Sequence, residues 1–287
     1  MTDHLAFFGF KENPFTLTPD RDYYFHSPTH SALEKVVQFG IDEGEGFIIV
    51  IGEVGTGKTM VMRQLIAGLS PKYETALVLS PLLSSRELLL AILRDLGLLG
   101  RYASGDLDSL LATLNDHLYN LSLKGRKLLV IIDEAHDLLP ESVEQLRLLS
   151  NFESDKQKWL QIILVGQPEL RTLIERSDLR QLLQRVTIFE TLRPLSRAET
   201  RAYVHHRLSR GGRPDLELGA QAEKVLWKYS HGVPRLINKL MNRALLVACS
   251  RQSQLITAPC MRAAVELVEK KSLLASLRLW MIRFLSR

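Results

Sequence analysis

A glycine-rich segment directly after an apolar run constrains this chain more than any other feature. Residues 52–59 match the pattern G-x-x-x-x-G-K-[ST], and residues 47–51 are five apolar residues in a row. The glycines of such a loop let backbone N–H groups approach phosphates, and the helix that follows directs its positive N-terminal end at them. The sequence therefore predicts a strand, a phosphate-binding loop and a helix, in that order.

The loop predicts the cofactors as well. Lys58 is expected to reach the β- and γ-phosphates of a bound ATP, and the Thr59 hydroxyl is expected to hold Mg²⁺. The alternative is a glycine-rich turn ahead of an ordinary helix, and the strand context disfavours it. The expected nucleotide-binding residues are Gly52, Glu53, Val54, Gly55, Thr56, Gly57, Lys58 and Thr59.

Two acidic residues at the end of a second apolar run predict the rest of the site. Residues 128–132 are apolar, and Asp133 and Glu134 follow them. Burying carboxylates beside a strand is costly unless they have a task. In P-loop enzymes the first acid positions Mg²⁺, the role expected for Asp133. Glu134 is then the predicted catalytic acid, because it would orient the attacking water. The pair favours ATP hydrolysis over nucleotide binding alone.

The order of apolar runs predicts an α/β fold. Strands are expected at 47–51, 75–79, 128–132, 160–166 and 186–189, with helical segments between them, and this alternation is typical of a parallel sheet covered by helices. A capping box at residues 196–199 opens a tail without further strands. We therefore expect an α/β nucleotide-binding core with its N-terminal linker at 1–195, a helical lid at 196–270 and a basic amphipathic tail at 271–287.

Composition and charge narrow the function classes. The chain has 287 residues, 46% of them hydrophobic, and neither a signal peptide nor an eighteen-residue apolar run, so a cytoplasmic protein that does not span the membrane is expected. Cys249 and Cys260 are expected to be reduced core thiols. Residues 1–170 contain 15 Lys and Arg against 23 Asp and Glu, whereas residues 171–287 contain 22 against 9.

The basic C-terminal part admits several partners. A polyanion, either nucleic acid or an anionic lipid surface, would be attracted to it, but arginines at subunit contacts and on solvated helix faces explain the same composition. Residues 272–287 combine Trp280 and Phe284 with Arg278 and Arg283, as an interfacial membrane anchor does. A terminal helix packed on the lid or on another subunit would have this composition too, so both interpretations stay open.

In five of its motifs the chain resembles the AAA+ ATPases and, within them, the ExeA type of general secretion pathway ATPase. The resemblance covers nearly the whole chain, from Phe8 to Val268. The motifs lie at residues 9–20, 52–59, 144–151, 166–170 and 232–235. In layout the chain is closer to stand-alone relatives found with mannose-sensitive haemagglutinin pilus assembly and with exosortase-linked polysaccharide loci.

The resemblance implies four further sites. It gives Gln167 the sensor position near the γ-phosphate, Arg185 the arginine finger, Arg235 the second sensor, and Asn13, Pro14 and Phe15 the adenine pocket. A finger supplied by another subunit implies a homo-oligomer, a ring with six subunits among the candidates. Residues 133–136 also spell the DEAH box of helicases, but those enzymes need two such cores, so His136 is interpreted as a loop residue near the catalytic water.

Two functions follow from the resemblance. In the first, ATP turnover assists the assembly of a pilus, type II secretion or polysaccharide-export apparatus at the inner membrane, by acting on an envelope-assembly protein. In the second, the basic half of the chain holds DNA and the ATPase serves transposition. The sequence contains no helix-turn-helix or aromatic interleaving that would favour DNA. A nucleotide-gated scaffold would need a damaged catalytic acid, and Glu134 is intact.

Overall fold

The structure consists of two compact units, which are described separately. The computed structural model describes residues 4–79, 83–99, 106–152 and 158–269. One unit contains residues 29–54 and 58–193, and the other contains residues 1–28, 55–57 and 194–287. Among the described residues, we find no helix with the length and apolar character needed to cross a bilayer.

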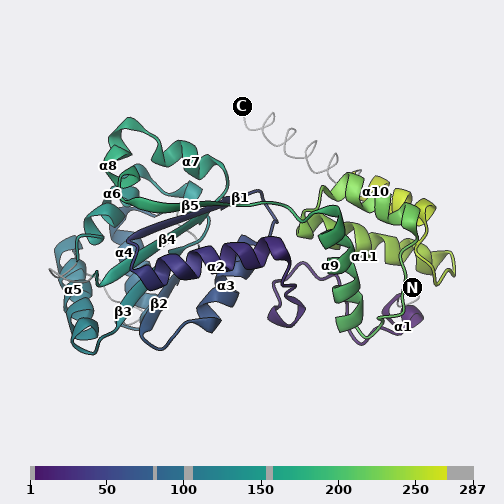
Figure 1. Cartoon of the computed structure of the whole chain (residues 1–287), viewed down its shortest axis with the longest axis horizontal. Helices are drawn as coiled ribbons and strands as arrows, with labels where there is room; N and C mark the ends of the chain where they lie inside the picture. Colours follow the sequence, from purple (N-terminus) through teal and green to yellow (C-terminus); the bar gives the residue numbers. More distant parts are fainter. Residues whose placement is uncertain (1–3, 80–82, 100–105, 153–157, 270–287) are drawn as a thin grey trace, which may run out of the picture. The chain divides into compact units, whose positions relative to one another are not determined.

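The first unit is built on a parallel sheet, as the sequence predicts. Within the described residues the sheet has five strands in the order β2-β3-β4-β1-β5, so the strand that leads into the glycine-rich loop lies between β4 and β5 (Figure 1). All four neighbouring pairs are parallel. The strands are β1 (Phe47–Gly52), β2 (Tyr73–Val78), β3 (Lys127–Ile132), β4 (Leu160–Gly166) and β5 (Val186–Leu192).

Helices cover both faces of this sheet because both faces are apolar. The residues of β1 and β4 are all buried, the pattern of strands in the interior of a parallel sheet. On one face, the alternate residues Phe47, Ile49 and Ile51 of β1 form a core with the helices from α4 to α8. These helices are α4 (Ser85–Asp95), α5 (Leu107–Leu123), α6 (Pro140–Leu149), α7 (Glu169–Ile174) and α8 (Arg180–Leu183).

The opposite face of the sheet is covered by α2 (Pro28–Glu43), which follows the strands closely (Figure 1). Gly40 makes this approach possible. A Cβ atom at Gly40 would lie 2.3 Å from Cδ1 of Ile188 and 2.9 Å from Cδ1 of Ile48, so a side chain there would displace these two isoleucine side chains. The helix α3 (Lys58–Gly68) begins inside the glycine-rich motif, so the predicted order of strand, loop and helix is confirmed.

The second unit is helical. Its main helices are α9, α10, α11 and the helical residues 258–269, and both cysteines are buried there as free thiols. The predicted capping box is present, because Ser196 and Glu199 exchange side-chain hydrogen bonds with each other's backbone at the start of α9. The bounds are α1 (His4–Phe8), η1 (Arg21–Tyr23), α9 (Arg197–Arg210), α10 (Ala220–Ser230) and α11 (Pro234–Ser250).

The N-terminal segment groups with the helical unit, whereas the boundaries expected from the sequence put it with the α/β core. Phe8, Phe10 and Phe15 are buried among residues of α9, α10 and α11. Arg207 of α9 supports the segment, because its Nε donates a hydrogen bond to the Pro14 carbonyl at 2.5 Å. The segment is therefore part of the helical unit's core. The predicted tail at 271–287 lies outside the described residues.

Candidate functional site

The predicted phosphate-binding and catalytic residues of the α/β unit gather at one edge of the sheet. In the parallel registers, Ile51 of β1 lies beside Gly166 of β4, and Ile132 of β3 lies beside Leu164 of β4. The segments that follow these three strands therefore leave the sheet side by side. Ligands of open α/β sheets bind at this carboxyl edge.

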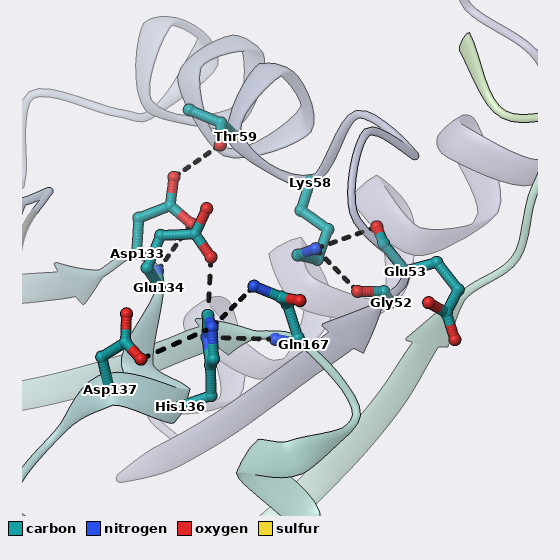
Figure 2. A network of polar contacts seen from close by, with 9 residues as sticks. All are labelled: Gly52, Glu53, Lys58, Thr59, Asp133, Glu134, His136, Asp137 and Gln167. Carbon is teal, nitrogen blue, oxygen red and sulfur yellow. Dashed lines mark hydrogen bonds and ion pairs between the residues drawn. The ribbon is translucent and has the colours of Figure 1, made fainter. Parts of the chain in front are cut away.

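Lys58 lies across the glycine-rich loop. Its ammonium donates hydrogen bonds to the carbonyl oxygens of Gly52 at 2.7 Å and Glu53 at 3.1 Å (Figure 2). Burial of the side chain lowers the pKa of Lys58, and the negative charge of Glu134, Asp133 and other nearby acids opposes this shift. The ammonium therefore lies against the loop, where the sequence predicts phosphate oxygens.

Two glycines of the loop occupy backbone conformations that suit glycine alone. Gly55 has a φ of 81° and Gly57 has a φ of 105°. A Cβ atom makes both conformations strained, so these positions explain two of the glycines in the motif. Thr56 between them is fully buried. The loop is therefore preset for backbone N–H groups to approach an anion.

Thr59 and Asp133 form the part of the site that fits a magnesium ion. Thr59 Oγ1 donates a hydrogen bond to Asp133 Oδ2 at 2.5 Å, and Asp133 is only 4% exposed. A hydroxyl and a carboxylate oxygen are the hard ligands that Mg²⁺ prefers beside substrate phosphates. These two residues fit the ion that the sequence predicts, and they would be its protein contacts.

Glu134 adopts a strained backbone conformation immediately after Asp133. Its φ of 53° lies in the left-handed region, and its N–H donates a hydrogen bond to Oδ1 of Asp133 at 2.9 Å. Left-handed backbone at a residue other than glycine costs about 1–3 kcal/mol and persists where the surroundings impose it, often at functional sites. The Glu134 side chain is 48% exposed, so a water molecule can reach its carboxylate.

Gln167 follows β4 and lies against His136. The Nε2 atoms of the two side chains are 2.6 Å apart, and the backbone N–H of Gln167 points to Nδ1 of His136 at 3.4 Å (Figure 2). His136 belongs to the short 3-10 turn η2 (Ala135–Asp137) that follows Glu134. Sequence reasoning placed His136 near the catalytic water but did not foresee this contact with Gln167.

Arg185 lies at the opposite edge of the sheet from Lys58. It precedes β5, whose first residue, Val186, is paired with Phe47 at the start of β1. The length of β1, roughly 17 Å at about 3.3 Å per residue, therefore separates Arg185 from the loop. Its Nη1 donates a hydrogen bond to Ser150 Oγ at 2.8 Å. One arginine side chain does not span this separation, so Arg185 cannot serve the nucleotide bound to its own chain.

The remaining predicted residues belong to the helical unit. Arg235 is the second residue of α11 and is exposed. Pro14 and Phe15 are buried in the core of the helical unit, and Asn13 Oδ1 accepts a hydrogen bond from the Phe15 N–H at 3.0 Å. The roles of these four residues toward a nucleotide stay predictions.

Known proteins share both the sequence pattern and the fold. A family profile described as "AAA domain" matches residues 41–174. The ORC2 protein of Aeropyrum pernix in its ADP form is similar in structure, with a TM-score of 0.67 and 18% identity, over 90% of this chain and 73% of that one. CDC6P of Pyrobaculum aerophilum has a TM-score of 0.69 and 14% identity, over 85% of this chain and 67% of that one. The RuvB branch migration motor of Thermotoga maritima has a TM-score of 0.55 and 18% identity, over 85% of this chain and 70% of that one.

With this fold and these motifs, the chain belongs to the AAA+ family of P-loop ATPases. Within that family it is of the ExeA type. It is 41% identical over 253 residues to general secretion pathway protein A of Aeromonas hydrophila. This match covers 88% of the chain and 46% of the relative, so the chain spans about half the length of that curated protein.

Proposed function

We propose that this chain hydrolyses ATP, with Mg²⁺, at the carboxyl edge of its sheet. One observation carries the proposal: the Thr59–Asp133 hydrogen bond joins the phosphate-binding loop to the segment after β3 that contains Glu134. Lys58, the metal-binding pair and the predicted catalytic acid are thereby held in one site. Nucleotide binding alone would not need a solvent-accessible carboxylate beside the metal-binding acid.

Each residue has a separate part in the proposed reaction. The loop N–H groups and Lys58 hold the phosphates and offset the negative charge that develops on the γ-phosphate. Mg²⁺ would supply positive charge that offsets the charge of the phosphates, and Thr59 and Asp133 would hold it. Glu134 orients the attacking water. Gln167 donates its side-chain amide to the γ-phosphate, the sensor role that the family resemblance implies.

Activity also requires a second subunit, in this proposal. Arg185 lies at the far edge of the sheet, held by Ser150, and has no access to its own loop. An arginine supplied by a neighbouring subunit can raise the rate of phosphoryl transfer by about 10³–10⁵. A homo-oligomeric ring, in which Arg185 of each subunit faces the nucleotide of the next, gives this arginine a function.

We further propose that ATP turnover serves the assembly of a secretion, pilus or polysaccharide-export apparatus at the cytoplasmic face of the inner membrane. The relative named general secretion pathway protein A supports a secretion-related role. The partner would be an envelope-assembly protein that is remodelled by the ring.

A second candidate, a DNA-associated ATPase of a transposition system, rests on the charge of the helical unit. Phosphate contacts from Lys and Arg supply most non-specific affinity for DNA. Basic side chains are exposed on three of the helices of this unit. Those on α9, α10 and α11 are Arg197, Arg201, Arg210, Lys224, Lys228 and Arg235. We rank this function second, because so dispersed a distribution also suits solvated helix faces.

Two variants test the proposed chemistry. Lys58→Ala should abolish tight ATP binding, because it removes the charge that lies across the loop. Glu134→Gln should bind ATP as the wild type does and lose turnover by at least about 100-fold, since the phosphate cradle and metal ligands stay in place. Steady-state phosphate release and a fluorescent-nucleotide titration separate these outcomes. Near-normal turnover by Glu134→Gln would show that Glu134 is not the catalytic acid.

A further inference from the structure

We propose that His136 is a positioning residue that couples the side-chain amide of Gln167 to the carboxylate of Glu134. This inference rests on the proposed ATPase function and adds a residue to it. Glu134 follows β3 and Gln167 follows β4, so the two side chains come from neighbouring strands of the sheet. The imidazole ring of His136 lies between them (Figure 2).

The two ring nitrogens of His136 contact different partners. Nδ1 is 3.5 Å from Oε2 of Glu134 and 3.4 Å from the backbone nitrogen of Gln167. Nε2 is 2.6 Å from Nε2 of Gln167 and 3.8 Å from Oδ1 of Asp137. The side chain is only 11% exposed, so few water molecules compete for these contacts. The shortest contact joins the ring to Gln167.

A neutral imidazole has one donor and one acceptor, so its two contacts are not independent. When the Gln167 side-chain NH₂ donates to Nε2, the proton of the ring is on Nδ1 and points to Glu134. When the Gln167 amide turns its oxygen to the ring, Nε2 carries the proton instead. Nδ1 then accepts from the Gln167 backbone N–H and no longer holds Glu134. The exchange moves one proton from Nδ1 to Nε2 through solvent, and the ring stays neutral.

This arrangement gives the Gln167 amide control of the catalytic acid. In the first state the N–H at Nδ1 of His136 faces the Glu134 carboxylate, 3.5 Å away, and restrains it, and in the second state the carboxylate is free to orient water. Because Gln167 is the proposed contact of the γ-phosphate, a bound triphosphate sets the direction of the amide. The position of the ring proton then determines whether the Glu134 carboxylate is restrained. Hydrolysis would thereby depend on a correctly placed γ-phosphate.

The strained turn at Glu134 brings these groups into contact. The left-handed φ of 53° at Glu134 reverses the chain directly after β3. Gly166, the last residue of β4, lies close to this turn: a Cβ atom there would be 3.1 Å from the backbone nitrogen of His136, a tighter contact than most side chains make. Turn η2 and the end of β4 are therefore packed closely, which fixes the position of the ring relative to Gln167.

Three substitutions of His136 in the full chain test the coupling. Asn carries a polar group near the position of Nδ1 only, Gln near that of Nε2 only, and Ala at neither. If the ring must join both partners, His136→Asn, His136→Gln and His136→Ala should each lower kcat by about 10- to 100-fold, the usual effect of misplacing a catalytic group by about 1 Å. The KM for ATP should change less than about threefold, because no phosphate contact is lost.

A double-mutant cycle with Gln167→Ala distinguishes coupling from a structural role. His136→Ala should lower kcat little further when Gln167 is already Ala, because the contact that it transmits is gone. Glu141→Gln is the control: it removes an exposed carboxylate of α6 five residues after His136, and kcat should stay within about twofold of the wild type. Thermal melting and fluorescent-ATP titration establish that each variant folds and binds ATP.

Two outcomes would overturn the coupling. One is a wild-type kcat in His136→Ala, and the other is a pair of losses from His136→Ala and Gln167→Ala that multiply as independent effects do. Failure of the proposed function would be seen elsewhere, as a wild-type chain that binds ATP without turnover, and it would remove the basis of the coupling too. If the wild type hydrolyses ATP and every His136 variant does so at the same rate, the coupling is refuted and the proposed ATPase function stands.

Discussion

Thr59 and Asp133 lie 74 residues apart in the sequence, and the hydroxyl of the first donates a 2.5 Å hydrogen bond to the carboxylate of the second. The contact links the start of α3 to the end of β3. Each residue is rigidly placed, because Thr59 belongs to the first turn of a helix and Asp133 is buried after an apolar strand. The proposed metal ligands are therefore in position within the folded chain.

The first prediction concerns this pair. Thr59→Ala should lower kcat/KM by about 10- to 100-fold and raise the Mg²⁺ concentration needed for half-maximal rate, because it removes one of two protein contacts to the ion. Thr59→Ser is the control, since it keeps the hydroxyl and should stay near the wild-type rate. ATPase assays over a range of Mg²⁺ concentrations, with EDTA as the zero point, measure both values. An unchanged Mg²⁺ dependence in Thr59→Ala would refute the assignment.

The second prediction concerns Arg185. If Arg185 acts on the nucleotide of a neighbouring subunit, specific activity should rise with protein concentration as rings form. Arg185→Ala should lower kcat by about 10³-fold or more. Mixing Arg185→Ala with Glu134→Gln subunits should restore part of the activity, because some interfaces then combine an intact Glu134 with an intact Arg185.

Ser150→Ala provides the control for Arg185. It removes the hydroxyl that accepts the Arg185 hydrogen bond but keeps the guanidinium. Activity near the wild-type value in Ser150→Ala would show that the loss in Arg185→Ala comes from the arginine itself. Turnover that does not depend on concentration, by a chain that sediments as a monomer, would contradict an arginine supplied by a second subunit.

The third prediction concerns the stability of the helical unit. Gly232 has a φ of 76°, and a Cβ atom there would lie 1.9 Å from the backbone oxygen of Leu195. Gly232→Ala should therefore lower the free energy of unfolding by about 2–3 kcal/mol, through backbone strain and a clash with main-chain atoms. Gly68→Ala is the control, because no atom lies within 4 Å of its Cβ position. Chemical denaturation of both variants measures the difference, and equal stability would contradict this account.

The sequence predicted the α/β unit well because its signals are local. Strand β1 and the loop after it are contiguous, and Asp133 directly follows an apolar run, so neither prediction needed knowledge of distant contacts. The parallel sheet follows from the same alternation of apolar strands and helices, whereas the spatial order of its strands comes from the structure alone. Gln167 was expected near the site because of the resemblance to the AAA+ ATPases, and the structure places it after β4, at the same edge of the sheet as Lys58.

Contacts between distant segments were beyond the reach of the sequence. Phe8 and Phe15 are apolar residues that any core would accept, and only the structure shows that they pack with α9, α10 and α11. The contact between His136 and Gln167 depends on a left-handed residue at Glu134, a conformation that few sequences signal. The D-E-A-H spelling singled out His136 but gave no indication of its partner.

The last prediction chooses between partners of the basic C-terminal part. A membrane surface and DNA both attract positive charge, but only a membrane also rewards the burial of Trp280, Phe284 and the leucines after residue 272. Deletion of residues 272–287 should therefore sharply reduce binding to vesicles that contain phosphatidylglycerol. It should leave ATPase activity near the wild-type rate, since every proposed nucleotide-site residue precedes 236.

Binding to DNA would differ from binding to vesicles in its salt dependence and in its response to the deletion. Binding to DNA through phosphate contacts should weaken steeply with salt, by about 0.9 log units of affinity per contact for each log unit of salt concentration. This binding should persist after the deletion, because the exposed basic residues of α9 and α10 stay in place. Vesicles of neutral phosphatidylcholine and a Trp280→Ala variant of the full chain separate charge from apolar burial. If the full-length protein does not bind anionic vesicles and duplex binding persists after truncation, the transposition function becomes the better explanation.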